Sequence, residues 1–281
     1  MHLHIAESLN ATNVGFWGKR TATLDWCEEN YVFCKYIAEF HNTTTNALFI
    51  LLAIYGMYLV NKLQHEMRFH LAYASFMLVG IGSWCFHMTL LYEMQLLDEL
   101  PMLYATCMAM YTVFETKEKP VYGWKFPALL VTVSAAISGI YLFVKSPIFH
   151  QVFYGLLTAV MVVRAGYNYN IIPPCPAKDS LRRLLLTSWI MYTLGFLVWN
   201  IDNNFCPQLR AIRASVGSPF DTLFQLHGWW HVLTAFGCFS FILYTQYSRL
   251  VMLGKANELA VEWKMGILPS LVARNNKAKL L

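Results

Sequence analysis

Seven long runs of apolar residues constrain this chain more than any other feature of its sequence. Each run holds about 20 mostly apolar residues, the length that a helix needs to cross the hydrocarbon core of a bilayer. Hydrophobic residues make up 57% of the 281 residues and charged residues only 13%, too few charges to cover a soluble domain of this size. We therefore predict an all-α membrane protein with seven transmembrane helices. They are expected near residues 43–60, 70–88, 96–114, 126–144, 148–166, 184–201 and 224–246.

The distribution of lysine and arginine orients this bundle, because cytoplasmic loops carry an excess of positive charge. With seven spans, fifteen of the 21 basic residues fall on the side of the C-terminus and six on the other side. We predict a lumenal or extracellular N-terminus, which the sequon at Asn10 fits, and a cytosolic C-terminus. No removable signal peptide is expected. The predicted parts are a lumenal segment (1–36), a seven-helix transmembrane domain (37–247) and a basic cytosolic tail (248–281).

Ionisable residues at the ends of three predicted spans are candidates for a functional site, because a charged group in a bilayer is costly. His87 ends the second span, Asp98 begins the third, and His227 and His231 open the seventh. In the predicted topology all four lie on the lumenal side. Three neutral imidazoles with an open fourth position form the ligand set of a catalytic zinc. We therefore predict a zinc site of His87, His227 and His231.

Each of these residues also has a simpler interpretation. A His-x-x-x-His pair is by itself weak evidence for a metal. Asp98, followed by Glu99 and Pro101, could cap the N-terminus of a helix, where carboxylates accept free N–H groups. Ser83, which lies one turn before His87 on the same helix face, could bond to the carbonyl one turn back. The convergence of the histidines on one side is what favours the metal site.

A cluster of oxygen ligands precedes the first predicted span. Asp25, Glu28, Glu29, Asn30 and Glu39 fall within fifteen residues and suit Ca²⁺ better than zinc. Their spacing is not that of an EF-hand, which also needs a glycine in the turn. Composition alone favours the simpler interpretation, an acidic loop in water.

Five ordered blocks of the sequence resemble the alkaline ceramidases, a family of zinc-dependent membrane amidases that cleave ceramide into a sphingoid base and a fatty acid. The resemblance runs from about Gly15 to about Tyr244, and the blocks are residues 23–31, 36–40, 82–90, 95–102 and 227–231. A looser resemblance extends to the adiponectin-type receptors and the GPI-remodelling membrane hydrolases.

The resemblance implies a role for each residue of the histidine cluster. Zinc is expected on His87, His227 and His231. Asp98 is expected to act as the base on the zinc-bound water and to deliver the proton to the leaving amine. Ser83 is expected to stabilise the oxyanion.

The resemblance also replaces the simpler interpretation of the acidic loop. The Ca²⁺ ligands that it implies exclude Glu29; they are Asp25, the Trp26 backbone carbonyl, Glu28, Asn30 and Glu39. It further implies a disulfide between Cys27 and Cys206. We expect calcium to hold the mouth of the pocket, so that Glu39→Ala lowers the calcium dependence and leaves the zinc content intact. By position alone, Trp199, Asn200 and Asp202 are candidates for residues at that mouth.

The expected function is therefore hydrolysis of ceramide by an integral protein of the endoplasmic reticulum or Golgi membrane, with no nucleic-acid partner. Two other functions remain open, a seven-helix lipid receptor with a residual hydrolase site and a lipid esterase of the GPI-remodelling type. The calcium-type loop favours the ceramidase over both.

Overall fold

The computed structural model describes residues 15–257 and 259–274, and this part of the chain is mostly helical. Asn10 lies outside the described residues. The long helices are α3 (Ala47–Lys62), α4 (Met67–Thr89), α5 (Tyr92–Phe114), α6 (Lys125–Val144), α7 (Pro147–Ile171), α8 (Lys178–Asn204) and α10 (Leu226–Met252). Shorter elements are α2 (Phe40–Thr45), α9 (Cys206–Val216), the 3-10 helix η1 (Phe220–Phe224), and the strands β1 (Leu259–Lys264) and β2 (Leu268–Ala273).

Within residues 15–257 and 259–274, six helical segments are long and apolar enough to cross a membrane, which indicates an integral membrane protein. They are Phe40–Lys62, which joins α2 and α3, together with α4, α6, α7, α8 and α10. The predicted third span forms the helix α5, which has the same length as α4. It is not among the six, because Glu93, Asp98 and Glu99 lower its hydropathy. Several helices extend beyond the predicted spans, since a helix continues past its apolar run into the headgroup region.

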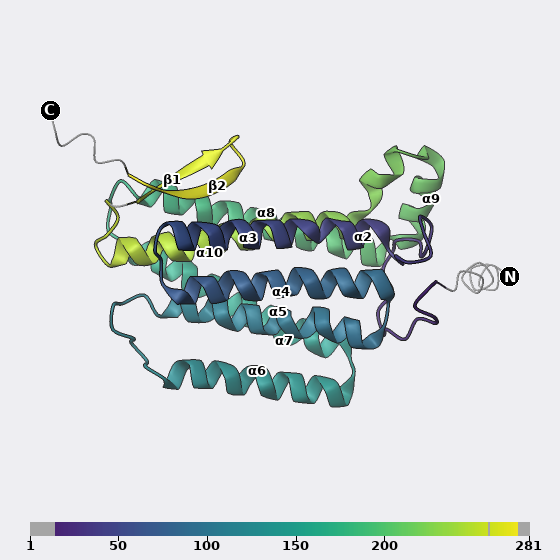
Figure 1. Ribbon diagram of the computed structural model, residues 1–281, viewed down its shortest axis with the longest axis horizontal. Coiled ribbons are helices and arrows are strands. Elements are labelled where there is room, and N and C mark those ends of the chain that lie inside the picture. The colour runs from purple at the N-terminus through teal and green to yellow at the C-terminus, as the bar shows by residue number, and fades with distance from the viewer. Residues whose placement is uncertain (1–14, 258, 275–281) are drawn as a thin grey trace.

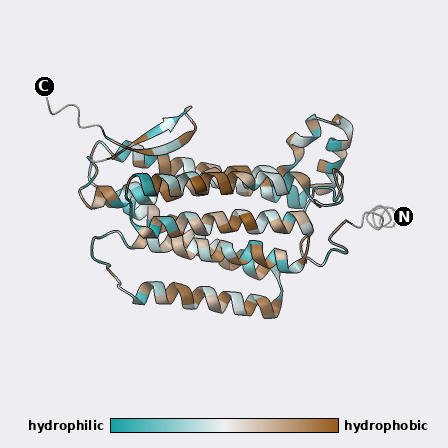
Figure 2. Ribbon diagram, viewed as in Figure 1, coloured by the Kyte–Doolittle hydropathy of each residue, from teal (hydrophilic) through white to brown (hydrophobic). Residues whose placement is uncertain are grey.

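The long helices lie side by side along the longest axis of the molecule (Figure 1). At one end lie residues 15–39, α2, α9 and the start of α10; we call this the histidine end, because His87, His227 and His231 lie there. At the opposite end lie the α3–α4, α5–α6 and α7–α8 connections and the two strands; we call this the hairpin end. Figure 2 shows hydrophobic residues along the helices and hydrophilic ones gathered toward both ends.

The centre of the bundle is α10, which packs against α8, α3, α4 and α5. Its second half is almost entirely buried, with Phe239, Tyr244 and Tyr247 in one apolar core that also holds Tyr73 of α4. In contrast, α6 packs only at the edge, against α5 and α7, and exposes Phe143 and other apolar side chains. Apolar side chains that face outward are expected where lipid replaces water around a bundle.

The tail departs from the predicted all-α fold, because β1 and β2 form an antiparallel hairpin. Met265 and Gly266 at its turn both have positive φ, a conformation that glycine adopts at no steric cost. Leu259 and Leu271 are buried in the main core. The all-α prediction is therefore wrong for residues 259–273, since a short strand pair lies within the polar, basic tail.

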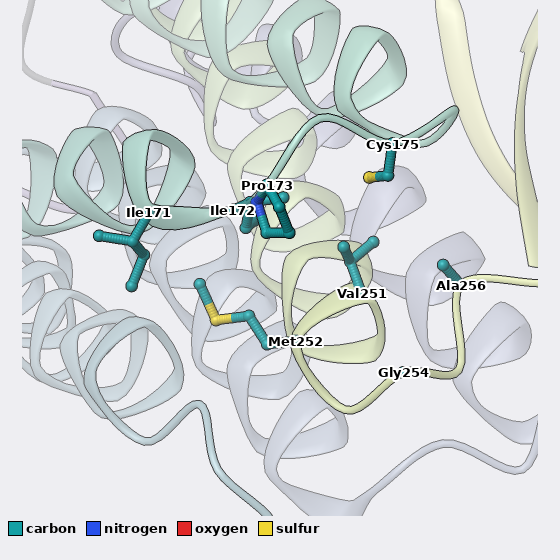
Figure 3. Close-up of a pocket in the computed structure, with 8 residues that line it drawn as sticks. All are labelled: Ile171, Ile172, Pro173, Cys175, Val251, Met252, Gly254 and Ala256. Atoms are coloured by element: carbon teal, nitrogen blue, oxygen red, sulfur yellow. The ribbon is translucent and has the colours of Figure 1, made fainter.

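An apolar pocket of about 420 Å³ lies at the hairpin end (Figure 3). Ile171 at the end of α7, with Ile172 and Cys175 of the α7–α8 connection, lines it together with Val251 and Met252 at the end of α10. Its lining contains no carboxylate or imidazole among the described residues. This pocket therefore lacks the groups that acid–base or metal chemistry needs.

Candidate active site

Three histidines from two helices meet at the histidine end. His87 lies in the last turn of α4, and His227 and His231 lie on the first turns of α10. The spacing of four residues places the two α10 imidazoles on one face. All three side chains are buried, and one nitrogen of each lies within 4.8 Å of the others. The structure thus brings together the three residues that the sequence predicted to converge.

The nitrogens of this cluster fit a metal ion. His87 Nδ1 lies 2.5 Å from Glu39 Oε2, and His231 Nδ1 lies 3.0 Å from the Thr45 hydroxyl. His87 Nε2 and His227 Nδ1 are buried and have no hydrogen-bond partner among the described residues. A buried polar atom without a partner is costly, and a metal ion would satisfy it. A carboxylate on the second nitrogen of a metal-binding histidine is also typical of such sites.

Ser83 and Asp98 lie beside this cluster because α4 and α5 touch at Gly82. A Cβ atom at Gly82 would lie 1.9 Å from the Leu97 carbonyl oxygen, so only glycine allows this close approach. The Ser83 hydroxyl is within hydrogen-bonding reach of the Asp98 carboxylate and accepts a bond from Asn46 Nδ2 at 3.0 Å. The carboxylate and the hydroxyl therefore face the same space.

Both simpler interpretations of these two residues are wrong. The helix α5 begins at Tyr92, six residues before Asp98, so this carboxylate lies beyond the first turn and is not a cap. Ser83 is held by Asn46 and Asp98, which belong to other helices. The predicted span began too late because the acidic residues of α5 interrupt the apolar pattern.

Two neighbours that the sequence did not indicate are Thr45 and Asn46 at the junction of α2 and α3. Thr45 contacts His231, and Asn46 Nδ2 lies 3.4 Å from the same imidazole while it bonds Ser83. Both are ordinary polar residues at the start of an apolar run, so no motif marks them. They connect the histidine cluster to Ser83.

An apolar cavity of about 550 Å³ extends from this site into the bundle. Ser83, Asp98, His227 and His231 line one end of it. Farther along, its wall is mostly apolar, with residues such as Phe76, Met102, Met161, Phe241 and Ile242. Polar groups at one end and a hydrocarbon wall beyond them suit a lipid whose reacting group lies near its head.

The three residues predicted at the mouth of the pocket have different positions. Trp199 lines the cavity, and Asn200 and Asp202 do not. The buried Asp202 carboxylate instead accepts the backbone N–H groups of Cys27 and His227, each at 3.3 Å. Asp202 therefore holds the start of α10, and its placement at the mouth was wrong.

The acidic loop converges beside the histidines. Trp26 stacks on the His227 ring, with 4.0 Å between the ring centroids. Glu28 and Glu39 are both buried. Burial, together with the Glu39 charge, raises the pKa of Glu28 to about 8. Burial, with a further contribution from Asp25, raises the pKa of Glu39 to about 8.

Some oxygens of this loop are free to bind a cation. Glu39 Oε1 and Asn30 Oδ1 are buried without a hydrogen-bond partner in the described part of the chain. The Glu28 carboxylate accepts the backbone N–H groups of His41 and Asn42, and Asp25 pairs with Arg20 at 2.5 Å. The Glu39 charge raises the pKa of Glu28, and the Asp25 charge raises that of Glu39. Carboxylates crowded in this way, next to unpaired oxygens, form a set that a hard cation would stabilise.

Comparison with known proteins places the chain in a family. The family described as Ceramidase matches residues 18–272. The chain belongs to the ceramidase family. It is 44% identical to alkaline ceramidase 3 of Mus musculus over 259 residues, which cover 92% of this chain and 94% of that protein. It is 36% identical to an alkaline ceramidase of Saccharomyces cerevisiae over 277 residues, which cover 94% and 88% of the two chains.

In this member of the ceramidase family, a disulfide joins the acidic loop to the start of α9. Cys27 and Cys206 form it, as the family resemblance implied. Next to it, the buried Arg213 of α9 donates to the Cys27 carbonyl at 2.7 Å and to Glu29 Oε1 at 3.1 Å. Glu29 therefore turns away from Glu28 and Glu39, which agrees with its exclusion from the implied calcium ligands.

Proposed function

We propose that this protein hydrolyses the amide bond of ceramide to a sphingoid base and a fatty acid. The observation that carries the proposal is that Ser83 and Asp98 line the same apolar cavity as His227 and His231, which belong to the buried cluster of three imidazoles. The relatives named alkaline ceramidases support the substrate. The apolar wall would hold the lipid chains, and the polar end would hold the amide.

The metal that fits the imidazole cluster best is zinc, held by His87, His227 and His231. Three nitrogen ligands without a thiolate leave a position open, as in hydrolytic zinc sites. When bound, zinc would lower the pKa of a water molecule and polarise the amide carbonyl. Glu39 and Thr45 would orient the imidazoles of His87 and His231 through their second nitrogens.

Asp98 would transfer the protons of the reaction, and Ser83 would stabilise the oxyanion. The Asp98 carboxylate would accept a proton from the attacking water and donate it to the amide nitrogen, so that the C–N bond breaks and the sphingoid base leaves as a neutral amine. The Ser83 hydroxyl would donate a hydrogen bond to the oxyanion that develops on the amide carbonyl. Asn46 Nδ2, which donates to Ser83 Oγ, would hold the hydroxyl in place. Its proton would turn from the Asp98 carboxylate to the oxyanion once Asp98 has taken the proton of the attacking water.

We also propose that α5 crosses the membrane as the seventh span. Its three carboxylates need not face lipid, because Asp98 and Glu99 line the cavity and Glu93 lies in the first turn. Seven crossings place residues 15–39 and the hairpin on opposite sides, as they lie in Figure 1. The histidine end would be lumenal and the hairpin end cytosolic in the endoplasmic reticulum or Golgi membrane.

Calcium is the proposed occupant of the acidic loop, with Asp25, the Trp26 carbonyl, Glu28, Asn30 and Glu39 as ligands. Bound there, Ca²⁺ would offset the repulsion between the buried carboxylates. The loop lies against His227 through Trp26 and against His87 through Glu39. Calcium would therefore hold the histidine cluster in place without taking part in the reaction.

The test is turnover and metal content of the purified full-length protein. We expect release of fatty acid from fluorescent ceramide, loss of that activity with a chelator, and about one zinc per chain by elemental analysis. His231→Ala should remove both the activity and the zinc. The matched control is His70→Ala, a histidine of α4 at the hairpin end, which should change neither.

The outcomes separate the alternatives. Tight ceramide binding without turnover in the zinc-loaded protein would indicate a receptor. Turnover of ester lipids in preference to ceramide would indicate an esterase. Full zinc content in His231→Ala would contradict the three-histidine site.

A further inference from the structure

The C-terminal hairpin lies alongside the helix bundle rather than beyond its end (Figure 1). The Tyr55 hydroxyl of α3 donates to Ser270 Oγ at 2.9 Å and accepts from Lys264 Nζ at 2.6 Å. Tyr55 lies seven residues before the end of α3, a distance of about 10 Å at the helical rise of 1.5 Å per residue. The hairpin is therefore level with the last turns of a candidate membrane helix.

A second candidate membrane helix holds the opposite face of the hairpin. The Arg183 guanidinium of α8 lies 4.0 Å from the centre of the Trp263 ring and donates to the Gly266 carbonyl at 3.3 Å. Arg183 is the sixth residue of α8, so the hairpin turn also lies past the start of this helix. Two helices that fit a bilayer thus place the turn within their own length.

The turn itself is apolar and exposed. Met265 is 95% exposed and Ile267 is 64% exposed, whereas Leu259 and Leu271 at the base are buried. Basic residues outnumber acidic ones around it. Within residues 178–183 and 259–274, the basic residues are Lys178, Arg182, Arg183, Lys264 and Arg274, and the acidic ones are Asp179 and Glu262.

This combination limits where the hairpin can lie. A two-stranded sheet has unpaired N–H and C=O groups along both edges, and such edges are not tolerated in lipid hydrocarbon. A nearly fully exposed methionine beside an isoleucine is in turn unfavourable in water. The headgroup layer satisfies both conditions, because it offers polar partners to the edges and apolar contacts to the tip.

We propose that the β1–β2 hairpin is a membrane-interface anchor. Its tip inserts Met265 and Ile267 into the leaflet at the hairpin end, and Lys264 and Arg183 lie there beside negatively charged phospholipid headgroups. Juxtamembrane basic residues are attracted to such headgroups. The anchor sets the depth of this end of the bundle, since Tyr55 and Arg183 connect it to α3 and α8. The proposal does not depend on the reaction.

The first test measures the depth of the tip. A fluorophore is attached to Met265→Cys in a full-length chain whose Cys34, Cys85, Cys107, Cys175 and Cys238 are replaced and whose Cys27–Cys206 disulfide is kept. In nanodiscs that contain phosphatidylserine, a lipid with a shallow nitroxide should quench this probe several-fold more than aqueous iodide does. The matched control is Glu118→Cys, an exposed position of the α5–α6 loop at the same end, which iodide should quench more.

The second test uses the wild-type protein and needs no substitution. Chloramine-T, a charged oxidant that stays in water, attacks methionines according to their exposure. By exposure alone, Met265 should react faster than Met67, which is 69% exposed at the same end of the bundle. Insertion predicts the reverse, with Met265 oxidised several-fold more slowly in nanodiscs with phosphatidylserine.

Other outcomes overturn the proposal. Iodide quenching at position 265 equal to that at position 118, or faster oxidation of Met265 than of Met67, would show that the tip lies in water. If nanodiscs of phosphatidylcholine alone protect position 265 from iodide and oxidant as well as nanodiscs with phosphatidylserine do, headgroup charge has no role. Protection that increases with protein concentration would identify a second copy of the chain as the partner instead.

Discussion

Both ends of the bundle bury charged groups, but the two ends differ in whether these groups have hydrogen-bond partners. At the hairpin end, the buried Arg249 pairs with Glu66 at 2.5 Å and donates to the carbonyls of Glu115 and Lys117. The buried Glu115 carboxylate accepts the N–H groups of Val121 and Tyr122. Every group in this set has a partner, and the set ties α10 to the α3–α4 and α5–α6 connections.

At the histidine end, buried groups keep atoms without partners. His87 Nε2, His227 Nδ1, Asn30 Oδ1 and Glu39 Oε1 have no hydrogen bond among the described residues. Satisfied buried groups stabilise a fold, whereas unsatisfied ones lower its stability unless a ligand completes them. The comparison supports a structural role for the Arg249–Glu66–Glu115 set and agrees with the proposed metal and substrate site at the histidine end.

The largest expected effect is on catalysis at the histidine end. Asp98→Asn keeps the shape of the side chain but cannot accept a proton, so turnover should fall by about 10²–10⁴-fold. Initial rates at saturating zinc measure it, and a thermal melt and zinc analysis show that the fold and the metal remain. Wild-type turnover in this variant would assign Asp98 to structure, as at the hairpin end.

The next effect is on stability at the hairpin end. Arg249→Met keeps an unbranched apolar stem but removes the guanidinium, so that the Lys117 carbonyl loses its donor and Glu66 and the Glu115 carbonyl keep only Arg68. We expect the free energy of unfolding to fall by about 1.5–3 kcal/mol, the range for hydrogen bonds to charged groups. Denaturant unfolding in mild detergent measures this change. Zinc content and rate per folded molecule should stay the same, and a loss of zinc would show that the two ends are coupled.

Substitution of Glu39 should weaken the binding of both zinc and calcium. The sequence alone led us to expect that Glu39→Ala leaves the zinc content intact. Its contact with His87 means that Glu39→Ala removes an orienting group of the zinc site, and zinc affinity should fall by about 10–100-fold. Asn30→Ala is the cleaner test of calcium, because no contact joins Asn30 to a histidine among the described residues.

A calcium titration at fixed zinc distinguishes these two variants. Wild type should show a rate and a melting temperature that rise with calcium. Asn30→Ala should lose that response and keep its zinc. If calcium shifts neither the rate nor the melt of wild type, the acidic loop binds no calcium.

The smallest effect is expected at Glu29. Its side chain is 39% exposed and pairs with Arg213, so Glu29→Gln should lower stability by about 0.2–1 kcal/mol, as for other partly exposed ion pairs. The matched variant is Glu28→Gln, whose buried carboxylate faces Glu39. Only Glu28→Gln should lose the calcium response. A calcium response kept by both variants would show that neither carboxylate is a calcium ligand.

The sequence alone determined the helices and the convergence of the histidines. Long apolar runs indicate helices in lipid, and the spacing of His227 and His231 places them on one face, because both patterns depend only on local geometry. The count of spans then predicted that His87 would lie at the same end. The exact start of α5 was missed, because Glu93, Asp98 and Glu99 interrupt its apolar run.

Only the tertiary structure decided which groups are paired and which are left open. The contacts of Glu39 with His87, of Asn46 with Ser83, and of Gly82 with the Leu97 carbonyl join segments that no local pattern relates. The bond between Asp202 and the start of α10 and the contact of the hairpin with Tyr55 also join segments that are far apart in the sequence. Hydrogen bonds and steric limits act between atoms a few ångströms apart, so they exist only once the helices have packed.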